Sequence, residues 1–194
     1  TVSQDQSVRQ SKVCVYAWCP RLLCGHGACS GSANARLRSM DAPSLAPLLL
    51  AWHADHGRHD LPWQQDRSAY RVWVSEVMLQ QTQVERVIPR YLEWLERWPT
   101  PATLASAPAA DVIRAWQGLG YYRRARFLHA AAKAVVERHS GTVPSDLDAL
   151  LALPGVGRYT AGAIASIVFA ARAPIVDGNV IRVFQRLAAH KGSA

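Results

Sequence analysis

From Leu45 onward the chain is a succession of apolar segments with helical spacing, joined by short connections that carry Gly or Pro. Apolar residues that recur every three or four positions predict amphipathic helices, and Gly and Pro predict the turns between them. No segment alternates apolar and polar residues as a half-buried strand does. The sequence therefore predicts an all-α chain, with helices at about 45–56, 69–80, 83–98, 109–117, 121–139, 146–152, 158–171 and 178–189.

Hydroxyl side chains precede three of these helices, where they are expected to act as N-caps. Ser44, Ser68 and Thr82 stand immediately before the segments that begin at 45, 69 and 83, and Pro99 follows the last residue of the third. Ser and Thr are favoured N-caps because the side-chain oxygen accepts a hydrogen bond from an N–H of the first turn. With 49% hydrophobic residues the chain can bury a core. No apolar run approaches the ~20 residues of a membrane span, so we expect a soluble protein.

The first 39 residues differ from the rest in composition. Gln, Ser, Gly and Cys predominate there, and residues 1–38 carry half of the net charge of +8. The four cysteines are separated by four residues each, a spacing typical of neither zinc sites nor common iron–sulfur runs. We expect Met40 to be the natural start, with residues 1–39 extraneous or disordered and no metal site in the chain. The cysteines are Cys14, Cys19, Cys24 and Cys29.

A glycine turn between two predicted helices is the first candidate binding motif. It reads Leu-Pro-Gly-Val-Gly-Arg-Tyr-Thr-Ala over residues 153–161. Gly155 and Gly157 allow a sharp turn, and the N–H groups that open the following helix can bind a phosphate. With the short helix before it, the turn forms a helix-hairpin-helix unit suited to holding a DNA backbone. A plain helix–helix turn is the alternative.

Two carboxylates are candidates for catalysis. Asp177 precedes the last predicted helix, where an N-cap role alone would explain it, although a capped carboxylate can also stabilise positive charge in a cavity. Glu76 lies on a nearly apolar helix, with Trp73 and Val77 within one turn. Apolar surroundings raise the pKa of a carboxyl and let it donate a proton near neutral pH. An exposed glutamate, or a buried one bonded to a hydroxyl, is the alternative.

Two further stretches have the residue types that contact bases. Gln80, Gln81 and Thr82 place amides and a hydroxyl at the end of the Glu76 helix, as a base-reading edge would require. The segment 117–126 reads Gln-Gly-Leu-Gly-Tyr-Tyr-Arg-Arg-Ala-Arg. Its aromatics can wedge between bases and its three arginines can meet phosphates. An aromatic core with a solvated basic face is the alternative.

Together these motifs resemble the helix-hairpin-helix DNA glycosylases, and specifically the MutY-type adenine glycosylases. The resemblance covers about residues 45–188, with the motifs in the family's order and spacing. It implies a six-helix barrel domain with an incomplete second helical lobe. The expected domains are an extraneous segment at 1–39, a helix of the second lobe at 40–68, the barrel with its hairpin at 69–172, and the start of the second lobe at 173–194.

The resemblance also implies an activity: hydrolysis of the N-glycosidic bond of adenine mispaired with 8-oxoguanine or guanine in duplex DNA, with the adenine flipped into a pocket. Glu76 resembles the acid that protonates adenine N7, and Asp177 the carboxylate that stabilises the oxocarbenium-like sugar. Tyr159 and Asn179 resemble residues that assist this step. The implied DNA-binding residues are Gln80, Gln81, Thr82, Leu119, Gly120, Tyr121, Gly155, Val156, Gly157, Arg158 and Thr160.

Tyr159 distinguishes between relatives. Endonuclease III-like glycosylase/lyases have a lysine here that forms a Schiff base and cuts the strand. Tyrosine cannot form that adduct, so the sequence favours a monofunctional glycosylase over an oxidised-pyrimidine glycosylase/lyase. A catalytically inactive DNA-binding fragment is the other alternative.

The resemblance further implies a [4Fe–4S] cluster in the full-length family member, whose four cysteine ligands would lie past residue 194 and are absent from this chain. A C-terminal domain that helps to recognise 8-oxoguanine would also follow that residue. The expected partner is double-stranded DNA with the adenine:8-oxoguanine mispair, without a membrane. We expect a monomer in a bacterial cytoplasm.

Overall fold

The computed structural model describes residues 42–187, with side chains from 47 to 186, and every regular element in that range is a helix. The prediction of an all-α chain is confirmed for these residues. Contacts divide them into two units, one of residues 59–173 and the other of 42–58 with 174–187. None of the described helices is long and apolar enough to cross a membrane. The expectations for residues 1–39 and their cysteines lie outside the described residues.

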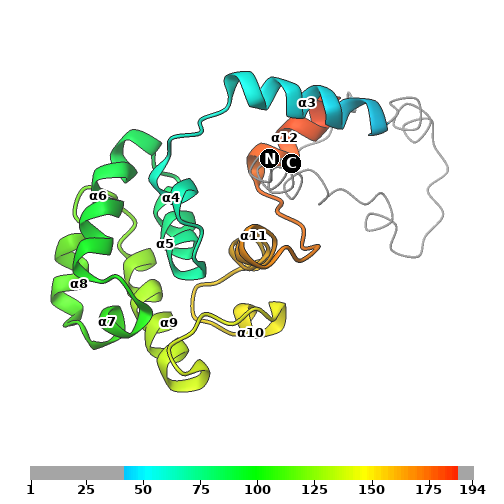
Figure 1. Ribbon diagram of the computed structural model, residues 1–194. Helices are drawn as coiled ribbons and strands as arrows, with labels where there is room; N and C mark the ends of the chain where they lie inside the picture. The colour runs from blue at the N-terminus through cyan, green and yellow to red at the C-terminus, as the bar shows by residue number, and fades with distance from the viewer. Residues whose placement is uncertain (1–41, 188–194) are drawn as a thin grey trace, which may run out of the picture. The chain divides into compact units, whose positions relative to one another are not determined.

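The larger unit contains eight helices of the described range, labelled in Figure 1. α9 packs against α7, α8 and α5, and α5 also packs against α6 and α11. α5 and α9 are therefore the two elements around which the unit is built. The helices are α4 (Pro62–Gln65), α5 (Ala69–Leu79), α6 (Val84–Arg97), α7 (Pro101–Ser106), α8 (Ala109–Ala115), α9 (Arg123–His139), α10 (Leu147–Leu151) and α11 (Arg158–Phe169).

A cluster of aromatic side chains forms the centre of the core. Trp94 lies edge-on to Trp98 and Trp116, with ring centroids 4.7 and 5.4 Å away. The Tyr70 hydroxyl donates to the Trp98 carbonyl at 2.9 Å and accepts from Trp94 Nε1 at 3.3 Å. Because buried polar groups cost free energy when they lack partners, these two bonds let a tyrosine hydroxyl sit inside an apolar core.

Residues 59–68 belong to the larger unit, whereas the sequence prediction grouped 40–68 with a second lobe. α4 packs against α5, and Trp63 lies edge-on to Tyr91 with ring centroids 5.4 Å apart. This aromatic contact anchors the segment before α5 to the core of the unit that bears α5. By their contacts, residues 59–68 therefore go with the unit that bears α5.

The cap predictions differ in outcome. Ser68 is the N-cap residue of α5, as predicted, although its side chain makes no cap hydrogen bond. α3 begins at Ala42, so Ser44 lies inside the helix and does not cap it. Gln83, and not Thr82, is the N-cap residue of α6. Two further helices, α4 and α7, were not predicted, although Thr100 caps α7 in a capping box with Thr103. Helices of four and six residues are too short to show a helical period in the sequence.

The smaller unit contains α3 (Ala42–His56) and α12 (Gly178–Leu187). On α3 the Trp52 and His56 rings are stacked, with centroids 5.3 Å apart. Leu48, Leu49 and Trp52 are exposed within the described structure, each at half or more of its surface. Both helices agree with the predicted ranges 45–56 and 178–189 to within a few residues at each end.

Candidate functional site

Glu76 lies in the middle of α5, the most deeply enclosed helix of the larger unit. Seven of the eleven residues of α5 are buried, among them its neighbours Ser75 and Val77. Glu76 itself is half-buried. Glu76 is therefore a partly accessible residue on a largely buried helix, and its role as a proton donor stays a prediction.

Tyr159 is brought to the same region by helix packing. It is the second residue of α11, is half-buried, and α11 packs directly against α5. The helix that carries Glu76 and the helix that carries Tyr159 are thus neighbours within one unit. These are two of the four residues predicted for catalysis.

The other two residues, Asp177 and Asn179, lie in the smaller unit at the start of α12. Asp177 Oδ1 accepts from the Val180 backbone N–H at 2.8 Å, and Oδ2 accepts from Asn179 Nδ2 at 2.9 Å. The N-cap role expected for Asp177 is therefore present. Asn179 Oδ1 in turn accepts from Arg182. Both oxygens of Asp177 are engaged, so the carboxylate is held in one orientation.

A groove of about 390 Å³ lies between the end of α5 and the turn before α9. Residues 81–86 form one wall of the groove and residues 118–121 the other. Gln81 on the first wall and Tyr121 on the second have left-handed backbones, with φ of 55° and 47°. Left-handed backbone costs a non-glycine residue ~1–2 kcal/mol, and such strain clusters at functional sites. Tyr121 is 63% exposed. The residues that line the groove are Gln81, Thr82, Gln83, Arg86, Gly118, Leu119, Gly120 and Tyr121.

Arg124 connects the two walls of this groove. Its Nη1 donates to the carbonyls of Val77, Met78 and Gln80 at 2.8, 2.9 and 2.6 Å. Its Nη2 donates to the carbonyls of Leu119 and Gly120 at 2.9 and 3.2 Å. Burial lowers the pKa of Arg124, yet the reference value is high enough for it to stay charged at neutral pH.

The role of Arg124 was missed in the sequence, where three arginines were expected to meet phosphates or solvent. Arg123 and Arg126 are exposed, but Arg124 turns inward. No local pattern marks this difference, because the carbonyls of α5 that it contacts lie more than 40 residues away in the chain.

The predicted hairpin is present, formed by α10, the turn 152–157 and α11. Asp146 caps α10 by accepting from the Ala149 N–H at 2.9 Å. Gly155 is left-handed at φ 74°, as predicted, whereas Gly157 has φ −91° and so does not need glycine for its backbone angle. Gly157 and Arg158, at the start of α11, are exposed. The first N–H groups of a helix have no intrahelical acceptor, so this is a place where a phosphate could bind.

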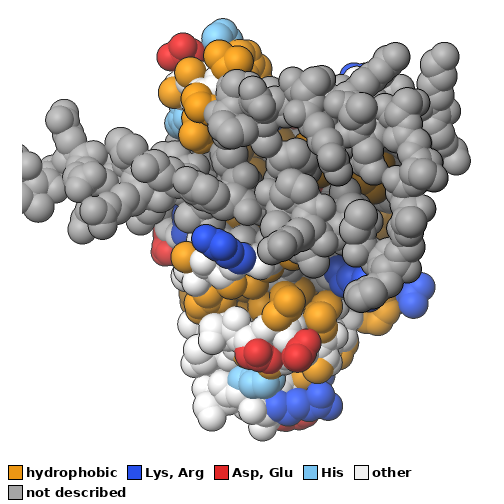
Figure 2. All heavy atoms as spheres, turned by 90° about the vertical axis from the view of Figure 1, so that its right-hand side faces the viewer, with side chains coloured by type: hydrophobic (Ala, Val, Ile, Leu, Met, Phe, Trp, Pro, Cys, Tyr) orange, Lys and Arg blue, Asp and Glu red, His pale blue; other side chains and the backbone are white. Residues whose placement is uncertain are grey.

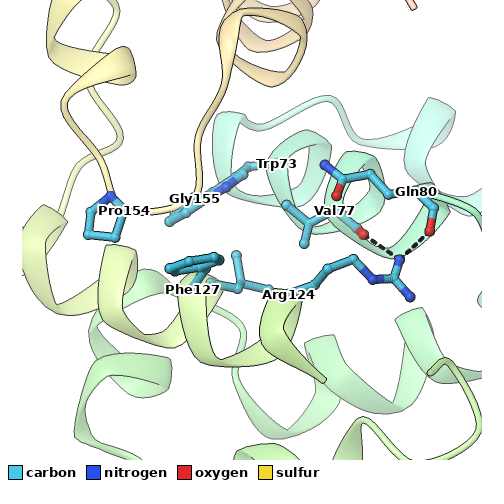
Figure 3. A pocket seen from close by; sticks show the side chains of 8 residues that line it. Trp73, Val77, Gln80, Arg124, Phe127, Pro154 and Gly155 are labelled. Carbon is cyan, nitrogen blue, oxygen red and sulfur yellow. Dashed lines mark hydrogen bonds between the residues drawn. The ribbon is translucent and has the colours of Figure 1, made fainter. Parts of the chain in front are cut away.

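The hairpin meets α5 and α9 around a small cavity of about 40 Å³ (Figure 3). Trp73 and Val77 face it from α5, Gln80 from the residue after α5, and Arg124 and Phe127 from α9. Small-molecule pockets usually measure several hundred Å³. This cavity is therefore a packing junction of three elements, too small to hold a nucleobase.

Several side chains predicted to contact DNA lie in the interior instead. Leu119 and Val156 are 5% and 6% exposed and belong to the hydrophobic core. Thr160 is 2% exposed, and its hydroxyl accepts from Gln80 Nε2 at 3.4 Å. The side chains of Leu119, Val156 and Thr160 therefore pack within the unit. An enclosed side chain is not available to insert into a duplex. Gln80 joins the end of α5 to the start of α11.

Positive charge does not gather into one patch on the face drawn in Figure 2. On the part of that face not covered by grey atoms, Lys and Arg side chains stand at separate places among hydrophobic and uncharged ones. Contact with a phosphate backbone there would rest on individual arginines and helix ends.

No group of three or more possible metal ligands occurs among the described residues. Residues 42–187 also contain no cysteine. A [4Fe–4S] cluster is bound by four cysteine thiolates, so this part of the chain does not fit one, and no step of the chemistry below involves a cluster.

Residues 74–194 match the family model described as HhH-GPD superfamily base excision DNA repair protein. The chain belongs to this superfamily. The match begins on α5 just before Glu76 and includes the groove walls, the hairpin and Asp177. It therefore contains every residue predicted for catalysis or DNA contact.

Adenine DNA glycosylases are among the proteins to which this chain is similar. The chain is 53% identical over 158 residues to the adenine DNA glycosylase of Rattus norvegicus. The matched region covers 77% of this chain and 30% of the relative. Identity to the protein of Mycolicibacterium smegmatis is 50% over 145 residues, or 74% of this chain and 49% of the relative. The protein of Homo sapiens is 52% identical over 150 residues, a match that covers 73% of this chain and 27% of the relative. The chain spans about a quarter to a half of the length of these relatives.

Solved structures give the same assignment of the fold. A thermostable thymine-DNA glycosylase matches with a TM-score of 0.69 and 26% identity, over 80% of this chain and 69% of that one. A non-covalent endonuclease III–DNA complex matches with a TM-score of 0.63 and 26% identity, over 74% and 67%. The predicted helix-hairpin-helix glycosylase fold is confirmed.

Proposed function

We propose that this protein releases adenine from adenine:8-oxoguanine and adenine:guanine mispairs in duplex DNA by hydrolysing the N-glycosidic bond. The observation that carries the proposal is the half-buried Glu76 on the enclosed helix α5, with α11 and its Tyr159 packed alongside. An identity of about half to curated adenine DNA glycosylases supports adenine as the base.

In the proposed reaction Glu76 acts as the general acid. It donates its proton to N7 of the flipped adenine, so that the base leaves with the electron pair of the C1′–N9 bond. Positive charge then develops on the sugar. A general acid must hold its proton near neutral pH, which an apolar setting favours. The enclosure of α5 supplies that setting.

Asp177 stabilises the sugar cation in this proposal. Its carboxylate accepts two hydrogen bonds at the start of α12, so its orientation is fixed before substrate binds. A preorganised negative group stabilises developing positive charge without reorganising during the reaction. Water then adds to C1′ and gives a proton to the Glu76 carboxylate, which restores the acid and leaves an abasic site and free adenine. Tyr159 and Asn179 assist by holding the substrate and the Asp177 carboxylate.

Tyr159 makes the proposed enzyme monofunctional. Strand cleavage by a glycosylase/lyase needs an amine that adds to C1′ as a Schiff base, and a phenol has no nitrogen with which to do so. The product is therefore an intact strand with an abasic site.

DNA is held at two places in this proposal. The N–H groups at the start of α11, with Gly157 and Arg158, bind backbone phosphates. Gln81 and Tyr121, on the two walls of the groove, enter the duplex beside the mispair while adenine leaves the stack.

Base release under single-turnover conditions tests the proposed function. A labelled duplex with one adenine opposite 8-oxoguanine is incubated with excess protein, and half of each sample is treated with alkali. Strand breaks only after alkali are the expected result. Breaks without alkali would indicate a lyase, and duplex binding without abasic sites would indicate a DNA-binding fragment that performs no chemistry.

A further inference from the structure

Within the described part of the chain, the hydrogen-bond acceptors of Arg124 are all uncharged oxygen atoms of the backbone or of Thr82. Five carbonyls and the Thr82 hydroxyl, the last at 3.1 Å from Nη2, surround the two terminal nitrogens. A guanidinium has four hydrogens on these two nitrogens. They are all occupied, so Arg124 has no terminal donor left for a phosphate and its function must lie within the protein.

The carbonyls of Gln80 and Gly120 have a special position among these acceptors. Each belongs to the peptide unit that immediately precedes a left-handed residue, Gln81 in one case and Tyr121 in the other. The φ angle of a residue sets the orientation of the peptide unit before it. By fixing both carbonyls, Arg124 holds the two backbone angles that place Gln81 and Tyr121 on opposite walls of the groove.

The remaining contacts of Arg124 stabilise the same geometry. Val77 and Met78 lie in the last turn of α5, whose carbonyls lack helical donors and carry partial negative charge, so a cation is favourable there. The guanidinium also lies over the rings of Trp116 and Tyr121, 5.3 and 5.6 Å from their centroids. The charge is thus enclosed by dipoles and aromatic faces that belong to both walls.

We infer that Arg124 is a positioning residue, which sets Gln81 and Tyr121 in their strained, duplex-entering conformation before DNA arrives. The inference rests on the proposed function, in which Gln81 and Tyr121 enter the duplex. Preorganisation of this kind lowers the entropic cost of binding, because the two residues are already ordered. Arg124 therefore acts through Gln81 and Tyr121 and does not itself touch DNA.

Lysine should not replace Arg124. A lysine ammonium is a compact point charge with three donors, whereas the planar fork of arginine spans acceptors on two separate segments. Arg124→Lys keeps the charge and removes the bridge, and Arg124→Met removes both. Arg114→Met is the matched control, because Arg114 is an exposed arginine of the same unit whose ion pair is with Asp111 on its own helix.

The experiment measures insertion into DNA separately from chemistry. The duplex contains 2-aminopurine beside 8-oxoguanine and a non-hydrolysable 2′-fluoro-adenosine opposite it. When Gln81 and Tyr121 enter the duplex, 2-aminopurine loses its stacking and its fluorescence rises. We expect wild type and Arg114→Met to give the full rise. We expect both Arg124 variants to give a reduced rise at saturating protein, and to bind the duplex at least about tenfold more weakly.

Hydrogen exchange distinguishes positioning from general stability. In folded Arg124→Lys, amide exchange should be faster at residues 78–83 and 117–122 and unchanged in α7 and α10. Faster exchange throughout the unit, failure of both variants to fold, or a wild-type fluorescence rise in a folded variant would each overturn the inference. So would the absence of a rise with wild type. A rise with wild type but no abasic sites in the base-release assay would refute the proposed function and leave Arg124 as the positioning residue.

Discussion

Gly155 lies so close to Phe127 that a Cβ built on the glycine would come within 2.4 Å of the Phe127 Cβ. This contact joins the hairpin turn to α9, the helix that also bears Arg124. Phe127 Cβ is fixed to its own backbone, so it cannot move aside as the end of a long side chain could.

Gly155→Ala is therefore expected to destabilise the protein. The left-handed φ of 74° costs an L-residue ~1–2 kcal/mol, and the overlap with Phe127 adds about 1–3 kcal/mol. Denaturant unfolding monitored by circular dichroism measures the sum. Gly157→Ala is the control for stability, because nothing lies within 4 Å of its Cβ position and its φ is ordinary. Equal stability of the two variants would contradict this account of the turn.

Tyr70→Phe tests the polar bonds inside the aromatic core. Removal of the hydroxyl leaves Trp94 Nε1 and the Trp98 carbonyl without this partner, and each orphaned buried group costs roughly 1–3 kcal/mol. The expected result is a lower thermal unfolding temperature than that of the exposed-site control Tyr122→Phe. If the two variants unfold at the same temperature, the Tyr70 hydroxyl is not needed by the core.

His129 should make the stability of the larger unit dependent on pH. It is 6% exposed, and burial and then the nearby Lys133 lower its pKa below the ordinary value, against opposing hydrogen bonds with the backbone of Ala105 and Ala107. The unfolded chain binds the proton at about pH 6.5, whereas the folded chain binds it only at lower pH. The free energy of unfolding should therefore fall as pH decreases below 6.5.

His129→Gln provides the comparison. This variant has no imidazole to protonate, so its free energy of unfolding should change less between pH 7 and pH 5 than that of wild type. Chemical denaturation at a series of pH values gives both profiles. Parallel profiles would show that His129 is not responsible for the pH dependence.

Much of the architecture could be predicted because helical periodicity is local. The apolar helix around Glu76 and the glycine hairpin both lie where the sequence placed them. Helix α7 was missed because its six residues hold too little periodic signal, although Thr100 and Pro101 together form a cap signature that could have indicated it.

The site was harder to predict, because its arrangement depends on contacts between distant segments. Leu119 was expected to contact DNA because of the family resemblance, but tertiary packing places its side chain in the core. Arg124 could not be separated from Arg123 and Arg126, since its acceptors on α5 belong to another part of the chain. Spacing along one helix predicts which residues share a face, and does not predict which backbone carbonyls they will meet.

The proposed general acid can be tested directly by comparing Glu76→Gln with Glu96→Gln, an exposed glutamate on α6. Glutamine keeps the shape of the side chain but has no proton to donate to adenine N7. Loss of a general acid lowers a rate by about 10²–10⁴-fold. The measurement is the single-turnover rate of adenine release from the adenine:8-oxoguanine duplex. We predict a loss of this size for Glu76→Gln, with duplex binding kept and a wild-type rate for Glu96→Gln. Adenine release by Glu76→Gln at the wild-type rate would contradict the assignment of Glu76 as the acid.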